Sequence, residues 1–196
     1  MDEVEKYCNI IVDGLNHVEQ SYYNLATTYD STGIVRERVF CYELYHQIRK
    51  IQESTQETGL TLNGEIDKRG HFEFAEEDRK NPDFVFHVPG SMNRNTIVIE
   101  VKGYLESQKY MNESINDFKK LITFVQKYHY QLGIFILYNY NFNEFVIKLK
   151  NEMNSICDHK STRIYDKIII ICKKSECSKS EIHTLQEIIS NPNIYL

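Results

Sequence analysis

Two strand-length apolar segments joined by a short turn, residues 83–88 and 96–101, constrain the fold of this chain more than any other feature. Apolar residues fill both faces of each segment, as Ile97, Val98 and Ile99 do in the second one. A strand with one solvated face alternates apolar and polar residues, whereas a strand buried on both faces does not. The pattern therefore predicts a central β-hairpin in a sheet that other elements cover on both sides.

The remaining segments predict helices and further strands around this hairpin. Apolar residues at helical spacing predict helices over 1–28, 34–54, 107–130, 142–157 and 179–190. Glycine-punctuated alternation predicts strands within 59–74, and apolar runs predict buried strands over 132–139 and 165–174. This order predicts an α/β fold, with a mixed central sheet flanked by helices and late strands joined by crossover helices.

The composition is typical of one globular domain. The 196 residues are 41% hydrophobic and 26% charged, and we expect them to form a single domain over 1–196. The formal net charge of −5 argues against binding nucleic acid by bulk electrostatic attraction. A nucleic-acid-binding protein of this charge needs a local basic patch, a metal ion or a partner.

Several signals favour a cytoplasmic protein that is not attached to a membrane. The longest apolar runs, such as 168–172, are far shorter than the ~20 residues of a transmembrane helix. The acidic N-terminus lacks the basic and apolar regions of a signal peptide. The five cysteines are irregularly spaced and fit neither a disulfide framework nor a zinc site, so we expect reduced thiols.

Three charged residues interrupt the apolar hairpin: Asp83, Glu100 and Lys102. Symmetric pairing about the turn would place Asp83 nearly opposite Val101, diagonal to Glu100 and Lys102, which share a face. Buried charges cost several kcal/mol unless they pair or bind a cation. Two converging carboxylates predict a hard divalent cation such as Mg²⁺. The alternative is a structural Glu100–Lys102 ion pair, with Asp83 as a turn residue after a proline.

A fourth carboxylate precedes the hairpin. Glu43 flanks the apolar stripe of the helix predicted over 34–54, and we expect it to reach over the sheet edge toward the hairpin. The alternative is an ordinary solvated glutamate on a helix.

Together these residues resemble the PD-(D/E)XK nuclease superfamily. The motif reads Pro82–Asp83, then Glu100–Val101–Lys102 on the next strand, with Glu43 on an upstream helix. The resemblance covers about residues 34–140 and implies a restriction-endonuclease-like α-β-β-β-α-β core. Residues 1–33 would then be an N-terminal helical extension, and 141–196 a C-terminal α-β-α decoration.

The resemblance implies a role for each residue of the motif. Asp83 and Glu100 would bind Mg²⁺ or Mn²⁺, together with the backbone carbonyl of Val101. Lys102 would orient or deprotonate the attacking water and stabilise the charge on the phosphate. Glu43 would be an auxiliary carboxylate, bound to the metal directly or through water.

Other polar residues are weaker candidates near this site. Asp67 is a candidate metal or water ligand, or a partner of the adjacent basic residues, and His87 is a candidate substrate contact or a packed strand histidine. Contact with phosphate is expected of basic residues, for which ordinary surface charge is the alternative: Lys68, Arg69, Arg94, Lys119 and Lys120.

The expected function is a Mg²⁺-dependent nuclease that hydrolyses phosphodiester bonds, with DNA as the expected substrate. Restriction, repair or anti-phage defence is implied only by the resemblance, and so is a homodimer, which cutting both strands of a duplex would favour. DNA against RNA and endonuclease against exonuclease action stay open. The alternative is a non-cleaving nucleic-acid-binding or protein-interaction module on the same fold, which the acidic net charge favours.

Overall fold

Six strands form one open mixed sheet in the order β1-β2-β3-β4-β5-β6. The computed structural model describes residues 2–26, 33–65, 75, 81–91, 94–103, 107–152, 156 and 162–191. The strands are β1 (Thr61–Gly64), β2 (Phe84–His87), β3 (Asn95–Gly103), β4 (Leu132–Tyr138), β5 (Ile168–Lys173) and β6 (Glu181–Thr184). β3, β4 and β5 run parallel, and the other neighbouring strands pair antiparallel.

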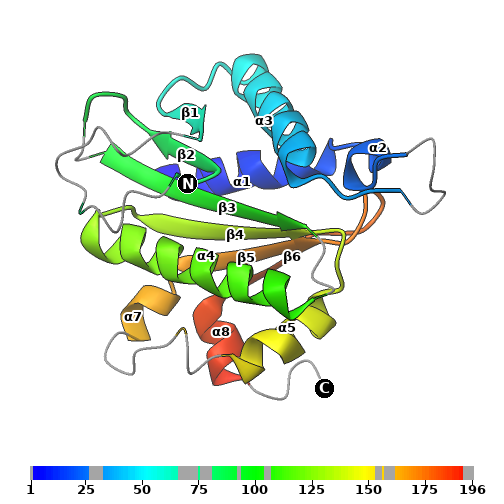
Figure 1. Ribbon diagram of the computed structural model, residues 1–196. Helices are drawn as coiled ribbons and strands as arrows, with labels where there is room; N and C mark the ends of the chain where they lie inside the picture. The colour runs from blue at the N-terminus through cyan, green and yellow to red at the C-terminus, as the bar shows by residue number, and fades with distance from the viewer. Residues whose placement is uncertain are drawn as a thin grey trace.

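Helices cover both faces of the sheet (Figure 1), as the sequence predicts for a mixed α/β fold. One face carries α1 (Glu3–Asn16), α2 (Gln20–Tyr23) and α3 (Glu37–Ser54). The other carries α4 (Gln108–Lys127), α5 (Phe142–Asn151), α7 (Thr162–Tyr165) and α8 (Leu185–Ser190). Each face therefore has its own apolar core, and the long parallel strands between them are buried on both sides.

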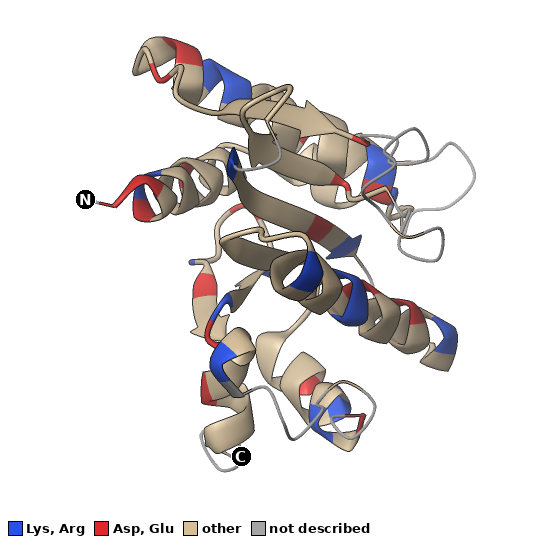
Figure 2. Cartoon of the chain, turned by 90° about the vertical axis from the view of Figure 1, so that its left-hand side faces the viewer, with Lys and Arg blue, Asp and Glu red and all other residues tan. Residues whose placement is uncertain are grey.

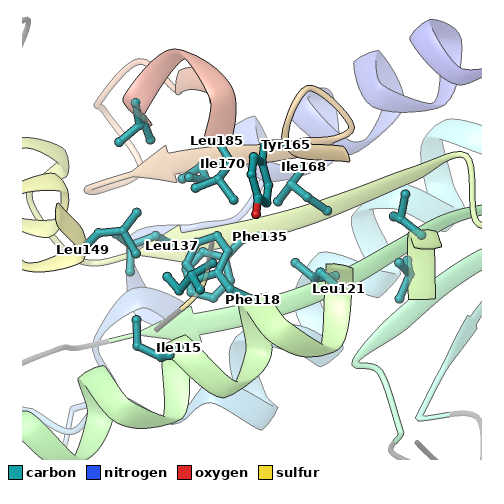
Figure 3. Packing of buried hydrophobic residues seen from close by; sticks show 14 of the residues in the cluster. Ile115, Phe118, Leu121, Phe135, Leu137, Leu149, Tyr165, Ile168, Ile170 and Leu185 are labelled. Atoms are coloured by element: carbon teal, nitrogen blue, oxygen red, sulfur yellow. The ribbon is translucent and has the colours of Figure 1, made fainter. Parts of the chain in front are cut away.

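Stacked aromatic rings hold α4 against the sheet (Figure 3). The ring of Phe118 on α4 lies 4.4 Å from that of Phe135 on β4, and Phe135 in turn stacks on Phe145 of α5 at 5.8 Å. All three side chains are fully buried. Aromatic pairs of this kind contribute roughly 0.5–1.5 kcal/mol beyond their buried area. They fix the position of α4, whose polar stripe faces the end of β3.

The central hairpin pairs one residue away from the expected register. Phe84 lies opposite Ile99, which by extension places Asp83 opposite Glu100 rather than Val101. Next to the turn, His87 pairs with Asn95, two residues away from the symmetric count. A bulge between Phe86 and His87 then leaves an extra residue on β3 and reduces the difference to one residue. Since directly opposed residues share a face, the shift brings Asp83 and Glu100 onto one face of the sheet.

Two predicted helices differ from the structure. The helix expected over 1–28 ends at Asn16 and is followed by the short α2. The helix expected over 179–190 begins as β6, because residues 181–184 pair with the open edge of β5. Thr184 then starts α8 with a reciprocal capping box to Glu187. Hydrophobic periodicity does not reveal such a short edge strand.

No helix in the described ranges is long and apolar enough to cross a membrane. Four cysteines lie in those ranges as free thiols: Cys8, Cys41, Cys172 and Cys177. The fifth, Cys157, lies outside them.

Candidate active site

Asp83 and Glu100 meet where the pairing of β2 and β3 ends. The Asp83 carboxylate accepts a hydrogen bond from the Val101 N–H at 2.7 Å. The side chain thus occupies the place of the next backbone partner, because β2 begins only at Phe84. Pro82, opposite Val101 by extension of the register, has no N–H to donate. The proline therefore ends the ladder and leaves this edge of β3 to the Asp83 carboxylate.

The backbone of Val101 also faces this edge. Its N–H points toward β2, since Asp83 accepts from it. In a strand the N–H and C=O of one residue point to the same side. The Val101 carbonyl therefore lies beside Asp83, with a proline opposite that cannot bond to it. This is the carbonyl that the resemblance assigns to the metal.

Two lysines connect these carboxylates to the surrounding helices. Lys120 Nζ on α4 lies 2.7 Å from Glu100 Oε2, and Lys102 Nζ lies 3.4 Å from Glu37 Oε2 at the start of α3. Asp117 on α4 bridges the two ammonium groups, at 3.4 Å from Lys102 and 3.5 Å from Lys120. Charged segments of β3 and α4 lie next to each other in Figure 2. We call Glu37, Asp83, Glu100, Lys102, Asp117 and Lys120 the charged cluster.

Helical spacing places the charged residues of α4 on one side of that helix. Asp117 and Lys120 are three residues apart, and Glu113, 4.0 Å from Lys102, lies one turn earlier. Residues at this spacing lie on one side of a helix. The stripe flanks the buried Phe118, so docking of α4 on β4 aims these charges at the end of β3.

The cluster adjoins a cleft of about 930 Å³ between α3, β1 and the start of β2. Glu37, Asp83 and Cys41 line its inner wall, and Arg36 and Arg38 lie on its exposed rim. A cleft of this volume is within the usual range for small-ligand sites. Two members of the charged cluster, Glu37 and Asp83, therefore line this cleft.

Burial raises the pKa of three carboxyl groups in the cluster. Desolvation is the largest effect on Glu37, Asp83 and Glu100, and for Glu100 it holds the pKa well above its usual range despite the nearby Lys120. Burial alone would lower the pKa of Lys102, but the facing carboxylates of Glu37 and Asp117 outweigh it and raise that pKa. The carboxylates therefore keep both lysines protonated. The carboxylates themselves outnumber the ammonium groups, and burial destabilises their charged forms.

This excess fits a divalent cation. The charged cluster has four carboxylates and two ammonium groups, and Glu113 adds a fifth carboxylate 4.0 Å from Lys102. Glu100 Oε1 is buried without a hydrogen-bond partner among the described residues. No three acidic, histidine or cysteine side chains in the described ranges form a metal-binding group. Mg²⁺ is usually held by one or two carboxylates plus substrate phosphate and water, not by a complete protein cage. Asp83, Glu100 and the Val101 carbonyl are a donor set of that kind.

Not every predicted site residue joins the cluster. Glu43 on α3 is half-buried, accepts a hydrogen bond from Gln47, and has no ion pair with either cluster lysine in the described structure. Glu37, six residues earlier on the same helix, lies beside Lys102 instead. His87 is four residues along from Asp83, about 13 Å at 3.3 Å per residue, and contacts Asn63.

The basic candidates divide in the same way. Lys120 lies in the cluster, whereas its neighbour Lys119 is exposed on α4. Arg94 pairs with Glu3 of α1 at 3.1 Å, away from the cluster. The candidates Asp67, Lys68 and Arg69 lie outside the described residues.

Sequence reasoning missed Glu37, Asp117 and the two cleft arginines, Arg36 and Arg38. A signal for Glu37 was present, because it is a second carboxylate on the helix that carries Glu43, six residues earlier. Asp117 had a signal as well, since it lies three residues before Lys120 and one before the buried Phe118. Both require the packing of helix on sheet, which the sequence does not state.

Comparison of the chain with family models, with curated proteins and with solved structures found no match. Proposals about its activity therefore depend on the geometry of the charged cluster.

Proposed function

We propose that this protein is a metal-dependent nuclease with a restriction-endonuclease-like core. The core would run from α3 through β1, β2, β3 and α4 to β4, an α-β-β-β-α-β order that agrees with the resemblance. The substrate class is a nucleic acid phosphodiester, with DNA as the expected form.

One observation carries the proposal. Asp83 and Glu100 converge at the end of a buried hairpin, Glu100 Oε1 lacks a hydrogen-bond partner in the described structure, and Lys102 follows on the same strand. Most buried side-chain oxygens of folded proteins have a hydrogen-bond partner, so a buried carboxylate oxygen without one requires an explanation. The unsatisfied carboxylate oxygen beside a second carboxylate supports a cation site.

The residues present divide the chemistry between them. Asp83, Glu100 and the Val101 carbonyl would hold Mg²⁺ or Mn²⁺, which would polarise the phosphate and lower the pKa of a bound water. Lys102, kept charged by Glu37 and Asp117, would place its ammonium group on the phosphate oxygen that gains negative charge. Glu37 and Asp117 orient Lys102 and thus act as positioning residues.

The rival function is a non-cleaving binding module on the same fold. Its support is that Lys120 and Lys102 already pair with four of the nearby carboxylates, so the charges partly neutralise one another. In that case the cluster would join α3, β3 and α4 and perform no chemistry.

Cleavage assays distinguish the two functions. Supercoiled, linear and single-stranded DNA and an RNA are incubated with the protein in Mg²⁺, in Mn²⁺ and in EDTA. We expect cleavage that requires the metal and is lost in Asp83→Asn and Lys102→Met. Glu53→Gln, an exposed change on α3, is the matched control and should cleave as the original protein does.

Each result has a clear reading. Metal-dependent cleavage that persists in both variants would place the activity elsewhere or in a contaminant. Absence of cleavage on every substrate by a folded protein that binds no metal would favour the binding module.

A further inference from the structure

A second polar site lies around Lys173, at the carboxyl end of β5. The charged cluster lies at the carboxyl end of β3, which runs parallel to β5 in the same sheet. Lys173 is the last residue of β5 and is paired with Tyr138, the last residue of β4. Its side chain is directed to the face that carries α1, where its Nζ donates to Asn16 Oδ1 at 3.2 Å and to the Ser178 carbonyl at 2.6 Å. Ligands of α/β sheets commonly bind outside the carboxyl ends of parallel strands.

The ammonium group of Lys173 is buried and forms no ion pair with any residue that the structure describes. Only 1% of the residue is exposed, and both of its hydrogen-bond partners are neutral. Glu176 on the connecting turn also lines the hollow beside Lys173, and its charge offsets part of the desolvation. Its carboxylate forms no ion pair with Lys173 in the described structure and accepts a hydrogen bond from the Gln20 N–H. Desolvation accordingly lowers the pKa of Lys173. Burying an uncompensated charge is costly, so a group that brings negative charge would be bound favourably.

A hollow of about 410 Å³ adjoins this lysine. Ser180 lines it, and the Ser180 hydroxyl is buried with no hydrogen-bond partner in the described structure. The exposed Lys179 lies on its rim. The hollow therefore offers a third donor on the Lys173 ammonium group, a hydroxyl without a partner and a second cation, against the single carboxylate of Glu176 on its lining.

A structural role alone explains less of this arrangement. Lys173 ties the turn after β5 to α1, but the turn already has its own support. The Ser178 hydroxyl bonds to both backbone groups of Ser175, and Glu176 and Gln20 bond to each other through two hydrogen bonds. A neutral donor would serve as a tether, and Ser180 would still be unsatisfied.

We propose that the hollow between α1 and the turn after β5 binds a phosphoryl group, with Lys173 and Ser180 as its inner donors and Lys179 at its mouth. A tetrahedral oxyanion offers several acceptors to donors that converge from different elements, and lysine binds phosphate as a point charge. The group comes either from free inorganic phosphate or from the backbone of a nucleic acid. The proposal stands apart from the proposed nuclease function, because it uses no residue of the charged cluster.

Inorganic phosphate is the first probe, and its binding to the full chain is measured by phosphorus NMR and calorimetry. We expect phosphate to bind the original protein and Lys174→Met, which removes an exposed neighbouring charge. Lys173→Met should weaken binding about tenfold or more, and Ser180→Ala a few-fold. A short single-stranded oligonucleotide is titrated in parallel, and a Lys173-dependent affinity for it alone would identify the nucleic acid backbone as the source.

Two results would overturn the site. One is that neither probe binds, or that binding is equal in Lys173→Met and the original protein. The other is that Ser180→Ala and Lys174→Met lower the affinity equally, which would indicate general surface charge. Should Lys173→Met fail to fold, the comparison of Ser180→Ala with Lys174→Met still decides.

Discussion

At the scale of residues, the arrangement of the charged cluster follows from the carboxylates with which each lysine pairs. Lys102 lies between Glu37 and Asp117, and Lys120 lies on Glu100. Both lysines, Asp117 and Glu100 are largely buried, and removing one partner from a buried pair leaves a costly unpaired charge. In the proposed nuclease the two lysines would therefore have different tasks: Lys102 would face the substrate, and Lys120 would face the metal ligand Glu100.

The position of Glu37 gives the first prediction. Glu37→Gln should lower the rate of phosphodiester cleavage by about tenfold, because Lys102 loses the carboxylate that orients it and raises its pKa. Glu43→Gln, a matched change six residues along the same helix, should leave the rate within about twofold. Single-turnover assays measure both rates. A larger loss in Glu43→Gln than in Glu37→Gln would restore Glu43 as the auxiliary carboxylate.

Lys120 gives the second prediction. Its ammonium group lies on Glu100 Oε2, where it would repel a cation bound at Oε1 and compete with it for the charge of the carboxylate. Lys120→Gln should therefore tighten Mn²⁺ binding about tenfold or more, while Lys119→Gln, an exposed neighbour, changes it less than about threefold. Calorimetry without nucleic acid gives the affinities. Weaker binding in Lys120→Gln would mean that Lys120 organises the site and does not compete for it.

At the scale of elements, the end of β3 is fixed by its contact with β4. Gly103 pairs with Tyr138, and a Cβ built on Gly103 would lie 2.4 Å from the Tyr138 ring. That ring stacks on Phe40 of α3 at 3.7 Å and is fully buried, so it has little room to move. The glycine therefore lets β3 continue past Lys102 while α3 stays close.

This contact gives the third prediction. Gly103→Ala should lower the free energy of unfolding by about 1–3 kcal/mol, since the added methyl group collides with a packed aromatic ring. Gly64→Ala in β1 is the control, because its Cβ would meet nothing closer than 3.5 Å. Urea denaturation of both variants measures the difference. Equal stability of the two would show that Tyr138 shifts at no cost.

How far the sequence could predict the elements depends on their length. The long helices and the buried strands β3, β4 and β5 have strong periodic or apolar patterns and were predicted. The strand β6 has four residues, and its pairing depends on an edge that only the folded sheet offers. The motif residues Asp83, Glu100 and Lys102 could be proposed from the sequence because charges are unusual in such strands. Glu37 and Asp117 were not found, because their contacts arise from helix packing.

At the scale of the whole molecule, the buried carboxyls couple stability to pH. Burial raises the pKa of Glu37, Asp83 and Glu100, so these groups keep protons in the folded state that the unfolded chain has already lost. Their contribution to stability is present below the usual carboxyl pKa of about 4.5 and is lost as pH rises through the raised values.

The fourth prediction follows from this sign. In EDTA, the original protein should lose unfolding free energy relative to Glu100→Gln/Lys120→Met between about pH 5 and about pH 7.5. Urea denaturation at the two pH values gives the comparison, and the double variant removes the pair without leaving one charge buried alone. A difference that is constant with pH would mean that Glu100 ionises in both states alike. Added Mg²⁺ should restore the lost stability of the original protein alone.

The most direct test of the central claim is a calorimetric titration of the metal-free protein with Mn²⁺. We predict about one ion per chain, with binding weakened about tenfold or more in Glu100→Gln and in Asp83→Asn and unchanged in Glu43→Gln. Circular dichroism confirms that each variant is folded. Absence of binding to the original protein, or equal binding by Glu100→Gln, would contradict a metal site at the end of the hairpin and with it the proposed nuclease.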